Sequence, residues 1–312
     1  MKVTILVPLY GVEKYIGECA ESLFSQTYRD VEYVFLDDCT PDNSVAALQA
    51  VIDRHPDRQP HIRILHNEQN MGIGGVRERL VSEVRTDAFM FVDSDDVITL
   101  NAVELMVKAM ERDDADIVEA AYCEFAHGMK GKVTMPFCGS LESYRSRLLC
   151  QNVLQNHVWG QLFSSRLIPA LPDFFMRGVD YAEDVCGMLR LMASVKKRST
   201  ISEVVYLYRT DNVTSYTNTM SMNHLVSVLR SNSIVWKYYT ERDEVSLPLE
   251  IGMLNVYRIL QRNHALTNPM LGLFAYHPQR LITRILAYGL RSSMLHSVAD
   301  LAYRITRKAC LK

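Results

Sequence analysis

The first third of the chain alternates short apolar runs with segments of helical periodicity. Four apolar runs have the length of a strand and occupy residues 3–8, 31–38, 62–67 and 88–93. The segments after them repeat apolar side chains every three or four residues, as one face of a helix requires. Unbroken apolar strands joined by helices predict a mostly parallel sheet covered by helices. We therefore predict an α/β, Rossmann-like fold.

Charged residues gather where these strands end. The carboxyl ends of parallel strands meet at one edge of the sheet, where ligands bind. One aromatic side chain and five carboxylates lie at or just after the ends of the predicted strands: Tyr10, Asp37, Asp38, Asp93, Asp95 and Asp96. Because like charges repel at short range, this edge predicts a bound cation.

The three aspartates at 93–96 have two interpretations. Mg²⁺ and Mn²⁺ bind carboxylate oxygens, and substrate phosphates complete their coordination. The alternative is a set of turn and cap residues before the helix predicted near residue 100. A calcium loop is excluded because Ile98 stands where such a loop needs glycine. The segment "GIGGVR" at 72–77 is neither a dinucleotide nor a P-loop motif.

The rest of the chain changes character twice. Residues 116–210 mix predicted strands and helices, and the pattern is helical from about residue 220. We predict one larger domain over 1–215, divided near residue 110, and a helical C-terminal extension over 216–312.

The composition of the chain limits the classes of protein and the cell compartments to be considered. The net charge of −2 over 312 residues argues against a general nucleic-acid binder. The seven cysteines include no C-x-x-C pair, which is typical of reduced thiols in a cytoplasmic protein. The N-terminal apolar run indicates a buried strand and not a signal peptide, and no run reaches the ~20 residues of a membrane-spanning helix.

Six segments together resemble glycosyltransferase family 2, the inverting enzymes of the GT-A fold. The likeness covers about the first 215 residues. It implies that they form the catalytic domain, with the nucleotide-sugar half over 1–110 and the acceptor half over 111–215. The segments occur in the family's order: "VTILVPLYGVEKYIGECAESLFSQTY", "VEYVFLDDCTPDNS", "NEQNMGIGGVRERL", "FMFVDSDD", "VDYAEDVCGMLR" and "YLYRTDNVTS". Four residues depart from the family's usual pattern and put local turn geometry in question: Gly11, Cys39, Pro41 and Glu78.

The resemblance implies roles for individual residues. Pro8, Tyr10 and Glu13 match the nucleotide pocket, with Tyr10 against a uracil ring. Asp38, with Asp37 beside it, matches the aspartate that accepts hydrogen bonds from the base. Arg77 matches an arginine near the base and phosphates, which suits a guanidinium. Asp93 and Ser94 match residues that bind the sugar nucleotide, and Asp93, Asp95 and Asp96 match residues that bind Mg²⁺ or Mn²⁺. Asp184, which follows Glu183, matches the catalytic base.

Several of these residues also have plainer interpretations. Glu183 and Asp184 open a predicted helix, where acidic side chains are favourable for dipole reasons alone. Trp159 and the neighbouring His157 are weak candidates for the acceptor site. Trp159 would stack on a sugar ring or pack in the core.

The resemblance implies an enzyme that transfers a sugar with inversion of configuration. The donor would be a UDP-sugar, and the acceptor a saccharide or lipid-linked saccharide in surface polysaccharide synthesis. A sugar-nucleotide nucleotidyltransferase is a rival, but it would need a glycine-rich, basic loop after the first strand, which "PLYGVEKY" lacks. A second rival is an inactive module that binds a nucleotide sugar. The presence of Asp93, Asp95, Asp96 and Asp184 argues against it.

The C-terminal tail is basic. Residues 279–312 hold seven arginines and lysines and one acid, Asp300, for a net charge of +6, with apolar residues interleaved. This pattern fits an amphipathic surface for anionic lipid, which would place a cytoplasmic protein at the inner face of the cell membrane. It also fits solvated helix faces or a homodimer contact.

Overall fold

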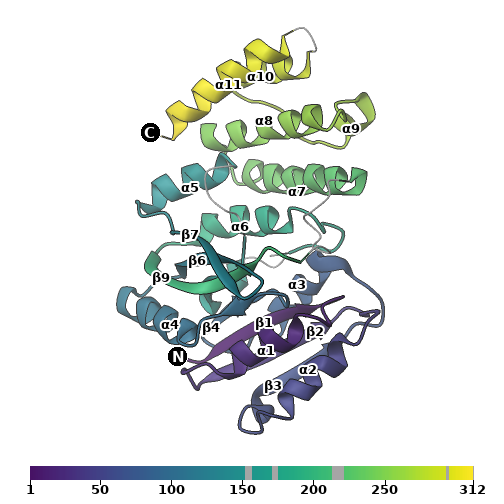
Figure 1. Ribbon diagram of the computed structural model, residues 1–312. Helices are drawn as coiled ribbons and strands as arrows, with labels where there is room; N and C mark the ends of the chain where they lie inside the picture. The colour runs from purple at the N-terminus through teal and green to yellow at the C-terminus, as the bar shows by residue number, and fades with distance from the viewer. Residues whose placement is uncertain (152–156, 171–174, 213–220, 293–294, 312) are drawn as a thin grey trace. The chain divides into compact units, whose positions relative to one another are not determined.

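The computed structural model describes the chain except for residues 152–156, 171–174, 213–220, 293–294 and 312 (Figure 1). Contacts divide it into two compact units. The sheet unit comprises Met1–Cys138, Val158–Gly178 and Ser194–Thr219. The helical unit comprises Gly139–His157, Val179–Ala193 and Met220–Lys312.

The sheet unit is built on nine described strands in the order β3-β2-β1-β4-β8-β6-β9-β5, with β7 paired to β6. The four strands predicted in the first third are present. The strand bounds are β1 Val3–Leu9, β2 Val31–Asp37, β3 Ile62–His66, β4 Ala88–Phe91, β5 Val97–Ile98, β6 Ile117–Ala126, β7 Met129–Thr134, β8 Gln161–Ser164 and β9 Arg198–Arg209.

Parallel pairing covers the part of the sheet that carries the predicted site. Strands β1–β4 pair in parallel with one another, and β6 pairs in parallel with β9. The shorter β5 and β8, and β7, are added by antiparallel pairing. The predicted α/β class is confirmed, and antiparallel strands extend its parallel centre.

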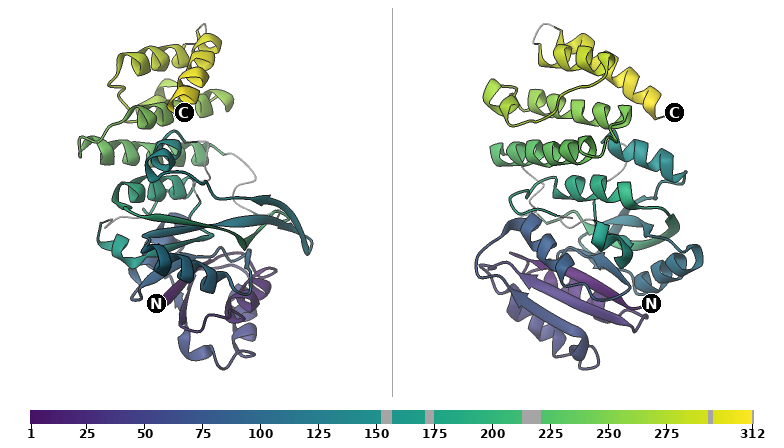
Figure 2. Two further views of the ribbon diagram at one scale, coloured as in Figure 1. Left: turned by 90° about the vertical axis from the view of Figure 1, so that its left-hand side faces the viewer. Right: turned by 180° about the vertical axis from the view of Figure 1, so that it is seen from behind.

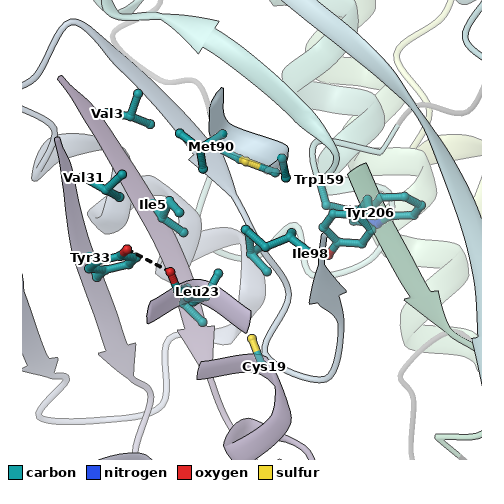
Figure 3. Packing of buried hydrophobic residues seen from close by; sticks show 14 of the residues in the cluster. Val3, Ile5, Cys19, Leu23, Val31, Tyr33, Met90, Ile98, Trp159 and Tyr206 are labelled. Atoms are coloured by element: carbon teal, nitrogen blue, oxygen red, sulfur yellow. Dashed lines mark hydrogen bonds between the residues drawn. The ribbon is translucent and has the colours of Figure 1, made fainter. Parts of the chain in front are cut away.

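Helices cover both faces of this sheet. Alternate residues of β1, such as Val3 and Ile5, pack with Cys19 and Leu23 of α1 in one apolar core (Figure 3). Because side chains alternate across a strand, the other β1 residues face the opposite side, where α3 contacts β1 and β2. Figure 2 shows these strands from behind. The helices are α1 Ile16–Phe24, α2 Ser44–Ile52, α3 Gly72–Ser82 and α4 Ala102–Asp113, with α2 and α4 in the α1 core.

The helical unit packs its helices around α8, which contacts α5, α7, α10 and α11. Figure 1 shows α6, α7, α8 and the α10–α11 pair as successive layers. A Cβ on Gly252 of α8 would lie 1.9 Å from the carbonyl oxygen of Leu149, so glycine permits this close contact with α5. The bounds are α5 Leu141–Leu149, α6 Glu183–Ser194, α7 Met222–Thr240, α8 Leu247–Arg262, α9 Asn268–Gly272, α10 Leu281–Arg291 and α11 His296–Cys310.

The two units differ in extent from the domains predicted from sequence. Helices α5 and α6 belong to the helical unit, although both lie before residue 215. They cluster there because α5 packs on α8 and α6 is hydrogen-bonded to α7. The functional division at residue 215, and at residue 110 within it, stays a prediction. No helix in the described part of the chain is long and apolar enough to cross a membrane.

Candidate active site

The turn that carries the predicted metal ligands is fixed by β9. The amide of Asp96 donates to the carbonyl oxygen of Asp93 at 3.0 Å, which closes the turn. Directly afterwards β5 pairs antiparallel with β9, with Ile98 opposite Tyr206. The acidic turn is therefore closed by its own backbone hydrogen bond, and the strand that follows it is held by pairing with β9.

Asp96 is directed toward β9. Its Oδ2 accepts a hydrogen bond from the Tyr206 hydroxyl at 2.7 Å, and its Oδ1 accepts from the Arg209 amide at 2.7 Å. Burial, followed by the charges of Asp95 and Asp93, raises the pKa of Asp96 well above its usual value. Because β9 engages both oxygens, the geometry favours a positioning role for Asp96 over the predicted role as third metal ligand.

Tyr206→Phe is expected to destabilise the protein by about 1.5–3 kcal/mol, because it removes a hydrogen bond to a buried carboxylate. The same hydroxyl accepts a bond from the Asp93 amide at 3.1 Å. Tyr33→Phe is the matched control, since that buried hydroxyl donates to the neutral carbonyl of Leu23 (Figure 3); it should cost about 0.5–1.5 kcal/mol. Urea denaturation measures both, and equal losses would contradict the role given to Tyr206.

Asp95 is partly buried, as is Asp93, the other carboxylate left for a ligand. Its Oδ2 accepts from the side-chain amide of Asn212 at 2.7 Å. Burial, and next the charge of Asp93, raises its pKa. The guanidinium of Arg209 donates to the Asp95 carbonyl oxygen at 2.6 Å and pairs with Glu18. Asp95 is thus held in place by groups that leave its charge only partly compensated.

Asp93 is paired with Arg77. The guanidinium of this buried arginine lies 2.9 Å from Asp93 Oδ1 and over the rings of Phe91 and Phe175. Asp93 remains partly exposed. The arginine expected near the phosphates therefore meets the acidic turn directly, while Ser94 between the two aspartates is buried.

No group of three His, Cys, Asp or Glu side chains in the described residues is arranged to hold a metal ion. Two carboxylates do come together at the turn, Asp93 and Asp95. This donor set fits Mg²⁺ or Mn²⁺, since Mg²⁺ commonly takes one or two carboxylates and completes its coordination with water and substrate phosphates. The residues present are compatible with a metal that arrives with a diphosphate.

The predicted base-binding aspartates support the start of α3 and the turn after β2. Asp38 accepts hydrogen bonds from the Asn67 side chain and from the amides of Met71 and Gly72, at 2.6–3.0 Å. A carboxylate is favourable there because the first amides of a helix lack partners within it. Asp37 accepts from the Thr40 amide at 2.9 Å. Base recognition by either residue stays a prediction.

The loop that carries Tyr10 is attached to the turn before α2. The amides of Gly11, Val12 and Glu13 donate to side-chain oxygens of Thr40, Ser44 and Asp42, at 2.8–3.0 Å. Glu13 in turn accepts from the Asn43 amide. Pro8 is buried at the end of β1, whereas Tyr10 is 53 % exposed. This arrangement leaves the Tyr10 ring accessible to a ligand.

Asp42 is the centre of that attachment. Burial alone would raise its pKa, but hydrogen bonds from Ser44, the Glu13 amide and Thr40 outweigh it and lower the pKa from 3.8 to about 2. The carboxylate therefore stabilises the fold only when it is ionised.

Asp42→Asn is expected to lower the free energy of unfolding by about 1–2 kcal/mol at pH 7, because amide nitrogen replaces an accepting oxygen. The folded-state pKa is below the unfolded value, so this stabilisation is present above about pH 4 and is lost as the pH falls toward 2. Urea denaturation between pH 7 and 3 measures it. The exposed Asp53→Asn is the control, and a pH-independent difference would contradict the assignment.

Glu183 and Asp184 lie in the first turn of α6, in the helical unit. The preceding Ala182 has a φ of +63°, and its carbonyl oxygen accepts a hydrogen bond from Ser231 of α7. Both acidic side chains are half-buried. The predicted base is thus placed at a helix start that α7 fixes, while the metal and nucleotide candidates belong to the sheet unit.

Trp159 lies in the core of the sheet unit. It stacks on Tyr206 and Tyr208, with ring centroids 4.6 and 5.0 Å apart, and is 8 % exposed. Figure 3 shows it beside Tyr206. This packing agrees with the core interpretation and leaves little ring surface for an acceptor sugar. His157 is half-buried in the helical unit, and its role stays untested.

Comparison with known proteins identifies the family. Residues 4–158 match the family described as Glycosyl transferase family 2, and curated relatives are glycosyltransferases. The chain belongs to glycosyltransferase family 2.

Two curated relatives of this family 2 chain are bacterial proteins. It is 29 % identical over 123 residues to glycosyltransferase GlyG of Streptococcus pneumoniae, and this match covers 39 % of this chain and 40 % of GlyG. It is 26 % identical over 214 residues to the uncharacterized glycosyltransferase EpsJ of Bacillus subtilis, and this match covers 66 % of this chain and 60 % of EpsJ. The chain thus spans less than two thirds of either relative.

Solved structures show the same GT-A fold. Staphylococcus aureus TarS 1–349, in complex with UDP-GlcNAc, matches with a TM-score of 0.65 at 17 % identity, over 98 % of this chain and 92 % of that one. The mannosyltransferase PcManGT of Pyrobaculum calidifontis, in complex with GDP-Man and Mn²⁺, matches with a TM-score of 0.54 at 14 % identity, over 99 % and 86 %.

Four residues of this family 2 site were not singled out from the sequence: Asp42, Tyr206, Arg209 and Asn212. Each acts through a partner distant in the chain, such as Asp96 for Tyr206 and Asp95 for Asn212. The signal available was the segment "YLYRTDN", which follows the family's pattern but does not reveal its partners. Only the pairing of β5 with β9 brings the two segments together.

Proposed function

We propose that this family 2 member transfers a sugar from a nucleotide diphosphate sugar, of the UDP class, to a hydroxyl group of a saccharide or lipid-linked saccharide, with inversion at the anomeric carbon. The observation that carries the proposal is the Asp93–Asp95 pair at the end of β4, where burial, and next the charge of Asp93, raises the pKa of Asp95. Such a pair suits a divalent cation and a diphosphate better than it suits a stable fold alone.

The donor would lie along the carboxyl edge of the parallel strands. The exposed Tyr10 ring is available to pack on the base, with Pro8 and Glu13 shaping its loop and Asp37 or Asp38 accepting from the base. Arg77 can exchange its bond to Asp93 for one to a phosphate, because a guanidinium binds both groups in the same geometry. Asp93 and Asp95, with Ser94 between them, would hold Mg²⁺ or Mn²⁺, which when bound offsets charge on the diphosphate.

Asp184 would act as the general base. Its carboxylate accepts the proton of the acceptor hydroxyl as that oxygen forms a bond to the anomeric carbon. The bond from this carbon to the diphosphate oxygen breaks, and the nucleoside diphosphate leaves with the electron pair. Attack from the side opposite the leaving group inverts the configuration, and no sugar–enzyme bond forms. Glu183 beside it would help to set the charge at the start of α6.

Relatives support the donor class and leave its base open. TarS is solved with UDP-GlcNAc, and PcManGT with GDP-Man and Mn²⁺. EpsJ and GlyG are named as glycosyltransferases. Surface polysaccharide synthesis is the setting we propose for this chain.

The test is a screen of donors. The full chain is incubated with Mn²⁺ and UDP-glucose, UDP-galactose, UDP-GlcNAc or GDP-mannose, and released nucleoside diphosphate is measured with and without saccharide acceptors. We expect one UDP-sugar to give diphosphate release that an acceptor accelerates. Pyrophosphate release from UTP and a sugar 1-phosphate would instead favour a nucleotidyltransferase, and tight UDP binding without any turnover would favour an inactive binding module.

A further inference from the structure

We propose that α10 and α11 form a surface that binds an anionic lipid bilayer, lying in its interface without crossing it. This surface, the α10–α11 face, is defined by Leu281, Ile285 and Tyr288 of α10 and by Val298, Leu301 and Ile305 of α11. Their side chains are 61–74 % exposed, which is unusual for residues of this size. The proposal does not depend on which sugar is transferred.

These residues form stripes that the fold does not use. On α10 they are spaced by four and three residues, and on α11 by three and four, so each set runs along one side of its helix. The opposite side of α10 buries Leu286 and Leu290, and that of α11 buries Ala299 and Tyr303. Each helix is therefore apolar on two opposite sides, although only one is needed for packing.

Both helices are fixed so that these stripes stay outside. A Cβ on Gly289 of α10 would lie 2.6 Å from the Cβ of Ala299 of α11, so the two helices touch closely at this glycine. Arg258 of α8 pairs with Asp300 and lies over the ring of Tyr303, which holds α11 onto α8. In Figures 1 and 2 the pair forms the outermost layer of the helical unit.

Cations border the apolar stripes. Arg284, Arg291 and Lys308 are exposed, and none has an ion pair with another described residue. The only acid of residues 279–312, Asp300, is already paired with Arg258 and Arg304. An exposed apolar stripe flanked by uncompensated cations is the pattern of a helix that lies in the interface of an anionic membrane.

The same charges argue against a second copy of this chain as the partner. A two-fold symmetric dimer through the α10–α11 face would place two sets of these cations opposite each other. Like charges opposed across an interface weaken it, whereas acidic headgroups complement them. The exposed Tyr288 also suits a bilayer, since tyrosine is enriched where hydrocarbon meets headgroups.

The experiment measures sedimentation of the full chain with phosphatidylcholine vesicles, prepared with or without phosphatidylglycerol, and with no nucleotide sugar present. We expect binding to the anionic vesicles and at least about 10-fold weaker binding to the neutral ones, with loss of the difference at high salt. Because no substrate is present, failure here is distinct from failure to transfer sugar.

Two variants separate the contributions. Ile285→Gln with Leu301→Gln and Ile305→Gln should reduce vesicle binding at least about 10-fold, and Arg284→Gln with Arg291→Gln and Lys308→Gln should remove the preference for phosphatidylglycerol. The control replaces exposed apolar residues outside the face, Leu100→Gln with Met129→Gln, and should bind as wild type. Circular dichroism checks folding.

Two results would overturn the proposal. One is wild-type binding to neither kind of vesicle. The other is a dimer, seen by analytical ultracentrifugation, that the apolar variant converts to a monomer while vesicle binding is unchanged, which would assign the face to a second copy of this chain.

Discussion

Asp184→Asn is expected to lower the rate of sugar transfer by about 10²–10⁴-fold, the contribution usual for a positioned general base. The asparagine keeps the shape of the side chain but cannot accept the acceptor proton. The affinity for UDP should be unchanged, because the nucleotide candidates belong to the sheet unit and Asp184 to the helical unit. Initial rates with the preferred donor, and UDP binding by calorimetry, measure both quantities.

Glu183→Gln is the matched comparison, since the two acids share the first turn of α6. If they serve only the helix dipole, each variant should lose about 0.3–1 kcal/mol of stability and neither should lose much activity. If Asp184 is the base, the two variants should have similar thermal midpoints and very different rates. Near wild-type transfer by Asp184→Asn, together with an inactive Glu183→Gln, would move the base to Glu183.

Asp95→Asn is expected to remove the effect of Mn²⁺ on UDP binding, with at least about 100-fold weaker binding in the presence of metal. The reason is that a bound cation stabilises the charge of the diphosphate by several kcal/mol. Without metal, the variant should bind UDP no more weakly than wild type. The reason is that Asp95 and the diphosphate repel each other, and the substitution removes one of the two charges. Titration of UDP with and without Mn²⁺ measures the difference.

Asp96→Asn is the control for this result. Both Asp96 oxygens accept hydrogen bonds from β9, so its substitution should lower stability and leave the Mn²⁺ dependence in place. Loss of that dependence in Asp96→Asn, at unchanged stability, would make Asp96 a metal ligand as the sequence alone suggested. Nucleotide binding by wild type that ignores Mn²⁺ would contradict the metal assignment for the whole turn.

The acidic edge of the sheet could be predicted because it depends on local pattern. Apolar runs such as 31–38 are too short for helices and too continuous for a half-exposed strand, so they indicate buried parallel strands. Once the strands are parallel, Asp38 and Asp93 must emerge at one edge. Their presence at the same edge needs no long-range information beyond this pairing.

The function of each carboxylate at that edge could not be predicted in the same way. Asp95 and Asp96 are adjacent and chemically identical, yet one accepts from Asn212 and the other from Tyr206 and the Arg209 amide. Which carboxylate meets which partner depends on the register between β5 and β9. A shift of one residue would exchange the two carboxylates. Trp159 likewise became a core residue because Tyr206 and Tyr208 lie beside it.

The sequence by itself determined the order of strands and helices in the first third, the gathering of carboxylates at one sheet edge and, through its motifs, membership of family 2. These follow from side-chain periodicity and from residues close together in the chain. Tertiary structure alone decided that β9 buries Asp96, that Asp42 holds the Tyr10 loop, and that α5 and α6 join the C-terminal helices. Each of those depends on contacts between distant segments, whose partners no local pattern specifies.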